Sequence, residues 1–166
     1  MQRYDVKNKI SKKVGDIMSS ILFEVANHIV KNIPNITAMK LQKLMYYCQS
    51  WSLAWDDKPL FNEDFQAWAN GPVCKELYNV HRGEFSISEN FFENMTDSKF
   101  EFSKEQLDTI NAVLDFYGDK SPHYLSELTH KENPWKEARK STPLGEPSKE
   151  IITKESMQNY YGGLIG

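Results

Sequence analysis

The chain has 166 residues, of which 40 % are hydrophobic and 13 % aromatic, and its formal net charge is −3. This length allows one domain with a substantial core, and the composition excludes a disordered chain. No apolar run approaches the roughly 18 residues of a transmembrane helix, and the N-terminus lacks the pattern of a secretory signal. The sequence therefore predicts a cytoplasmic protein.

Charge is unevenly distributed along the chain. Residues 1–16 carry five Lys or Arg and two Asp, residues 84–119 nine acidic side chains and two lysines, and residues 120–154 seven basic and five acidic side chains. Their net charges are +3, −7 and +2. There is no continuous basic stripe for a phosphate backbone, and the acidic middle repels one, so nucleic-acid binding is disfavoured, with the basic N-terminus as its one supporting feature.

The first part of the chain predicts two helices. We expect residues 1–15 to form a flexible basic arm and residues 16–166 to form a single domain. Asp16 is the expected N-cap of a helix that runs to Asn32 and ends before Pro34. Thr37 caps the next helix, whose buried face is expected to be Leu41, Leu44, Cys48, Trp51 and Trp55, with Lys40, Lys43, Gln49, Ser50 and Ser52 pointing elsewhere.

A corner follows these helices. Residues 65–68 read as an extended segment, and Asn70, Gly71 and Pro72 interrupt it. Proline suits a first helical turn, so Pro72 predicts the start of a helix that runs to about residue 81.

The second half predicts shorter elements. The segment EFSIS is a candidate for a second strand that pairs with residues 65–68, and ENFFENM for one helical turn. Four helices follow, opened by Ser103 with Gln106, by Ser121-Pro122, by Asn133-Pro134 and by Thr153, and residues 151–152 are expected to be extended. The predicted fold class is mainly α, a compact single domain of about six to seven helices, and it allows for a small two- or three-stranded β element.

No residue pattern indicates catalysis, a cofactor or a metal. Cys48 and Cys74 lie in apolar patterns without paired ligand spacing, so both are expected to be buried hydrophobic residues. The glycines form no nucleotide-binding loop, and no nucleophile constellation is readable. The four histidines, His28, His81, His123 and His130, are expected to be solvated or capping residues.

Tryptophans beside corners are the more informative feature. Trp68 precedes the Asn70-Gly71-Pro72 corner, and Trp135 opens a late helix. Tryptophan is a common anchor of protein–protein contacts, and it is also a frequent core residue, so both roles remain open for these two residues. One arrangement expected at the corner is that Trp68 packs under Trp135.

Several motifs, in one order, resemble the SocA-like or Panacea antitoxin domain, which includes phage-associated and GepA-like proteins. They are L-Q-K-L-x-Y-Y-x-Q at residues 41–49, P-L-F at 59–61, an acidic pair at 63–64, W-x-x-G-P at 68–72, L-T-H at 128–130 and P-W at 134–135. The resemblance spans about residues 17 to 162. It implies a bacterial or prophage protein that neutralises a protein toxin by direct contact. The resemblance also allows a role as an adaptor that delivers the toxin to a protease.

The residues expected to bind the partner are Glu63, Trp68, Asn70, Gly71, His130 and Trp135. The resemblance brings no catalytic residues with it, and no helix-turn-helix segment is readable before the first helix. Two other hypotheses remain open. One is a prophage-encoded regulator or effector that binds a host protein, and the other is a hydrolase that uses His130 with Glu63 or Asp64.

Overall fold

The computed structural model describes residues 21–165, and the expected basic arm and the Asp16 cap lie outside this part of the chain. Seven α-helices are described, together with a three-stranded sheet, so the predicted fold class is confirmed. The helices are α2 (Ile21–Asn32), α3 (Ala38–Trp55), α4 (Lys75–His81), α5 (Lys104–Tyr117), α6 (Pro122–Lys131), α7 (Asn133–Arg139) and α8 (Lys154–Gly163).

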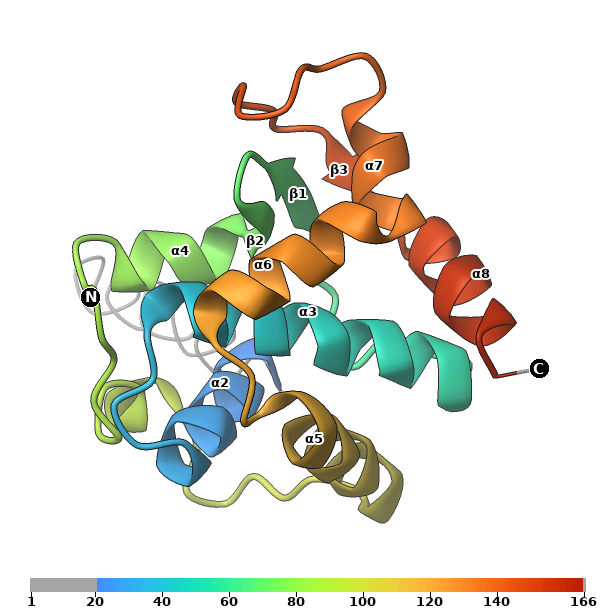
Figure 1. Ribbon diagram of the computed structural model, residues 1–166. Coiled ribbons are helices and arrows are strands. Elements are labelled where there is room, and N and C mark those ends of the chain that lie inside the picture. Colours follow the sequence, from blue (N-terminus) through green and yellow to red (C-terminus); the bar gives the residue numbers. More distant parts are fainter. Residues whose placement is uncertain (1–20, 166) are drawn as a thin grey trace, which may run out of the picture.

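Helix α3 is the centre of the molecule and contacts α2, α5, α6, α8 and strand β2 (Figure 1). Since it has neighbours on every side, all ten residues from 41 to 50 are buried. The prediction that Lys43, Gln49, Ser50 and Ser52 point away from the core is therefore wrong, because each finds a hydrogen-bond partner inside the protein. Trp55 ends the helix and is 47 % exposed, so the predicted apolar face does not extend to it.

The sheet consists of β1 (Phe65–Trp68), β2 (Gly71–Cys74) and β3 (Ile151–Ile152), in the order β2-β1-β3 with antiparallel pairs. The extended segments at 65–68 and 151–152 are confirmed. The helical assignment of Pro72 is wrong, because Pro72 pairs with Ala67 in β2 and the helix begins three residues later. β2 is an edge strand, where a residue without an N–H is tolerated.

The segment EFSIS does not pair with β1. Its Ser86 forms an isolated bridge with Thr37, just before α3, and residues 151–152 take the place beside β1. The predicted helical turn in ENFFENM is confirmed as the short 3-10 helix η1 (Glu93–Met95).

Polar residues cap most helices as predicted. Thr37, Ser121 and Thr153 each accept a hydrogen bond from the backbone N–H three residues later, and Ser103 with Gln106 forms a complete capping box. α7 departs from the prediction, because its N-cap is Glu132 rather than Asn133. The Glu132 side chain makes no cap bond, since its carboxylate binds two buried tyrosines instead.

Within residues 21–165 no helix combines the length and the apolar character that crossing a membrane requires.

Candidate functional site

The Asn70-Gly71-Pro72 corner is fixed from inside by α3 and α6. Gly71 has a φ of +114°, a conformation that L residues rarely adopt. A Cβ at this position would lie 2.5 Å from Lys43 Cε and 2.9 Å from Thr129 Oγ1. Glycine is therefore required both by the backbone angle and by the space, which explains the glycine of the W-x-x-G-P motif.

Lys43 lies beneath this corner and is fully buried. Its Nζ donates to the carbonyl oxygen of Pro72 at 3.2 Å, and burial lowers the pKa of Lys43 from 10.5 to about 7. The lysine thus links the centre of α3 to β2 at the corner.

The lowered pKa of Lys43 predicts a pH dependence of stability. Between pH 7 and the ordinary value of 10.5 the unfolded chain binds a proton at Lys43 that the folded protein has lost. The free energy of unfolding should therefore rise with pH, at most by about 1.4 kcal/mol per pH unit. We expect this rise in urea denaturation between pH 7 and 8.5, below the range in which the cysteine thiols of the unfolded chain ionise strongly.

The matched variant for this prediction is Lys43→Met, whose unbranched side chain is close in length to the aliphatic part of lysine but cannot titrate. Its unfolding free energy should change less over the same pH range, so the difference between the two proteins should depend on pH. Parallel curves for the wild type and the variant would contradict the assignment of the slope to Lys43.

Trp135 supports the corner from α7. It is only 3 % exposed, and its Nε1 donates to the carbonyl oxygen of Trp68 at 2.9 Å. The His130 ring stacks on it with centroids 4.1 Å apart, and the Arg139 guanidinium lies 4.8 Å from its centroid. Of the two roles left open by the sequence, Trp135 has that of a core residue.

The Trp68 side chain does not pack under Trp135, because only its backbone carbonyl is engaged there. Its ring meets Tyr78 edge-on at 4.9 Å, and Nε1 donates to Gln66 Oε1 at 2.8 Å. The half-buried ring borders a hollow of about 270 Å³ that it shares with Ala69, Asn70, Val73 and residues 147–149. Trp68 therefore remains available as a surface residue.

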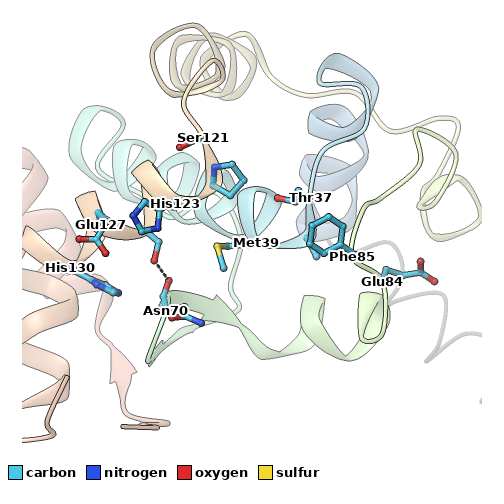
Figure 2. Close-up of a pocket in the computed structure, with 12 residues that line it drawn as sticks. Thr37, Met39, Asn70, Glu84, Phe85, Ser121, His123, Glu127 and His130 are labelled. Carbon is cyan, nitrogen blue, oxygen red and sulfur yellow. Dashed lines mark hydrogen bonds between the residues drawn. The ribbon is translucent and has the colours of Figure 1, made fainter. Parts of the chain in front are cut away.

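A larger hollow, which we call the corner groove, lies on the other side of Asn70 (Figure 2). Its volume is about 540 Å³, and it is formed by the start of α3, the loop after α4 and one side of α6. Its lining residues are Thr37, Ala38, Met39, Asn70, Glu84, Phe85, Ser121, Pro122, His123, Ser126, Glu127 and His130. Ser126 Oγ donates to the carbonyl oxygen of Asn70 at 2.6 Å and fixes α6 to the corner.

The structure brings only part of the predicted partner-binding set to the corner groove. Asn70 and His130 line it, and Trp68 lies at the neighbouring hollow. Gly71 and Trp135 are buried, so they act on this surface only by holding its backbone. Glu63 precedes β1, where its charge contributes to a raised pKa of the buried Cys74 thiol, which burial mainly causes.

Of the groups in the hydrolase hypothesis, one carboxylate is paired with a lysine and the histidine is partly removed from solvent. Asp64 binds Lys154 Nζ at 2.6 Å, and burial lowers the pKa of His130, whose Nε2 has no hydrogen-bond partner within residues 21–165. Over the same residues no cluster of three or more histidine, cysteine or acidic side chains has a geometry that fits a metal ion. The corner groove itself is lined by both apolar and charged side chains.

A family model described as Antitoxin SocA-like, Panacea domain matches residues 41–136, which is more than half of the chain. The chain belongs to this family. The match is shorter than the span of about residues 17 to 162 that the motifs suggested. No curated protein and no solved structure matches the chain.

In the first motif of this Panacea domain, residues 41–49, both glutamines form hydrogen bonds inside the protein. Gln42 accepts a hydrogen bond from the Cys74 backbone N–H at 2.9 Å and lies 2.9 Å from the His81 ring, which is buried rather than solvated as predicted. Gln49 accepts from the N–H of Leu60 at 2.8 Å and donates to the Phe61 carbonyl at 2.7 Å. The glutamines thus hold β2 and the P-L-F segment against α3.

A buried carboxylate was missed by the sequence reasoning. Glu132 accepts hydrogen bonds from the hydroxyls of Tyr47 at 2.6 Å and Tyr161 at 2.9 Å, and burial raises its pKa. These bonds join α3 and α8 at the start of α7. The Tyr-Tyr pair of the motif could have indicated such a residue, since a buried tyrosine hydroxyl needs a hydrogen-bond partner.

Proposed function

We propose that this Panacea domain is an antitoxin-like binding module that neutralises a protein toxin by direct contact. The observation that carries this proposal is the membership of the chain in the SocA-like antitoxin family, across residues 41–136. A protein partner is the expected ligand of such a domain. Neutralisation then requires a surface that covers or distorts part of the toxin.

The corner groove and the adjacent face of Trp68 are the surface that we assign to this contact. Asn70 and His130 contribute to it directly, together with the strongly exposed Phe85. Gly71 and Trp135 hold the surface in place from below, whereas Glu63 precedes β1 at the end of that strand away from the corner. Contacts of this kind bind through exposed aromatic residues that are set on a fixed backbone.

The proposal predicts that a small toxin is encoded beside this chain, and co-expression of the two proteins tests it. Expressed alone, that neighbour should stop growth, and the Panacea domain should restore growth. The two proteins should elute from a size-exclusion column as one stoichiometric complex. A neighbour that is harmless, or a toxic one that the domain neither binds nor neutralises, would contradict the proposal.

The same experiment separates the finer alternatives. Under adaptor activity, the amount of toxin falls when the domain is present and recovers in cells that lack the responsible protease. With simple neutralisation, the toxin accumulates in the complex. If the domain is instead a regulator or effector of a host protein, it should not bind the neighbouring protein and should co-purify with a different protein of the cell.

A further inference from the structure

We propose that the corner groove takes a segment of the toxin in which an apolar side chain is flanked by lysine or arginine. This inference rests on the proposed function, because it assumes that the groove faces a protein. It adds the chemistry of the segment and the residues that recognise it, and it follows from the shape, the backbone support and the charge of the groove.

The apolar part of the groove is exposed although its backbone is fixed. Phe85 is 84 % exposed and Met39 is 38 % exposed, and both side chains line the hollow (Figure 2). Phe85 does not belong to a free loop, because its carbonyl oxygen accepts from the Ala38 N–H at 2.9 Å and Ile87 N–H donates to Ile36 at 2.8 Å. Two exposed apolar side chains that line the same hollow are typical of a binding site.

The charge of the groove is negative. Its twelve lining residues include two carboxylates, Glu84 and Glu127, and neither lysine nor arginine. Neither carboxylate forms an ion pair within the described residues, although several other surface carboxylates do, including Glu93, Glu105 and Asp108. In Figure 2 the two carboxylates point outward at opposite ends of the groove. Charge complementarity therefore favours basic side chains on either side of an apolar one.

One neighbouring lysine is already paired with a carboxylate. Lys120, in the loop before α6, is paired with Asp119 at 3.6 Å and lies about 6 Å from the ring centres of the exposed Phe116 and Tyr124. The segment from residue 84 to 119 has a net charge of −7, which adds a long-range attraction for a basic partner.

The test is a titration of the isotope-labelled full chain with two short peptides, followed by NMR. The first probe is acetyl-Lys-Lys-Phe-Lys-Lys-amide, and the second is the same peptide with glutamates in place of the lysines. The lysine peptide should shift the signals of Met39 and Phe85 in a saturable way, and its affinity should fall several-fold as salt rises from 50 to 300 mM, because salt screens exposed charges. The glutamate peptide should bind at least tenfold more weakly.

Matched variants identify the recognising residues. Phe85→Ala should weaken the binding of the lysine peptide at least fivefold. Leu144→Ala, at a residue that is 81 % exposed on the loop after α7, should leave the affinity for this peptide unchanged. The double variant E84Q/E127Q should reduce both the affinity and its salt dependence, and the exposed Glu150→Gln serves as its control. Circular dichroism confirms that the variants are folded.

Three outcomes would overturn the inference: no saturable shifts in the groove, equal affinity for the two peptides, or tighter binding there of a twelve-nucleotide single-stranded DNA. Failure of the proposed function is distinguishable from these results. A domain that binds the lysine peptide in the groove but neutralises no neighbouring toxin contradicts the function alone. If the Phe85→Ala variant neutralises the toxin as well as the wild-type chain does, only the assignment of the contact to the corner groove is contradicted.

Discussion

Replacing Trp135 with alanine is expected to lower the free energy of unfolding by about 3–5 kcal/mol, the range for truncating a large buried aromatic residue. The indole is almost fully buried, and its loss also leaves the Trp68 carbonyl without its hydrogen bond and His130 without its stacking partner. Urea denaturation followed by circular dichroism measures this change.

Trp68→Ala is the matched comparison, because Trp68 lies at the same junction but is only half-buried. Its expected cost is about 1–2 kcal/mol, near the centre of the distribution for point substitutions. Equal costs for the two variants, or a Trp135→Ala protein as stable as the wild type, would show that α7 does not support the corner as described.

Gly71→Ala is the second substitution with a large expected effect. The positive φ angle costs about 1–3 kcal/mol for a residue with a side chain, and the contact with Lys43 and Thr129 adds about 1–3 kcal/mol of overpacking. We expect a loss of about 2–6 kcal/mol in the unfolding free energy, the sum of these two costs, together with NMR shifts at Asn70 and in α6. The corner would be displaced even in molecules that remain folded.

Substitutions at two other glycines distinguish the cost of the backbone angle from the cost of overpacking. Gly145 also has a positive φ, of +85°, but nothing lies within 4 Å of its added Cβ, so Gly145→Ala measures the backbone cost alone. Gly162 lies in α8 with open space around it, and Gly162→Ala should be neutral or stabilising by about 0.5–1 kcal/mol. If Gly71→Ala costs no more than Gly145→Ala, then the close approach of Lys43 does not constrain the corner.

Local signals in the sequence correctly predicted where four of the helices begin. A capping side chain acts over three residues, so Thr37, Ser103, Ser121 and Thr153 can be recognised without knowledge of the tertiary structure. The same holds for the strand at residues 65–68, whose bounding corner follows it directly.

Predictions that depended on distant neighbours were wrong. Polar side chains of α3 were expected at the surface, and they are buried because five elements surround this helix and supply partners. Pro72 was placed in a helix, because its pairing with Ala67 depends on the whole sheet. The place beside β1 was given to EFSIS rather than to residues 151–152, since proximity in sequence says little about strand pairing across 80 residues or more.

The candidate site was predicted only in part for the same reason. The corner residues and His130 were selected from motifs, and Asn70 and His130 do line the groove. Phe85, Met39 and Glu127 were not selected, because they come from three segments that only the fold brings together. An exposed phenylalanine cannot be told from a core phenylalanine by its sequence context.

The most direct test of the account is the growth of cells that co-express the neighbouring toxin with the domain carrying Phe85→Asp or, as its control, Leu144→Asp. The account predicts that Leu144→Asp restores growth as the wild type does, while Phe85→Asp remains folded and fails to restore it. Equal rescue by both variants would contradict a toxin contact at the corner groove.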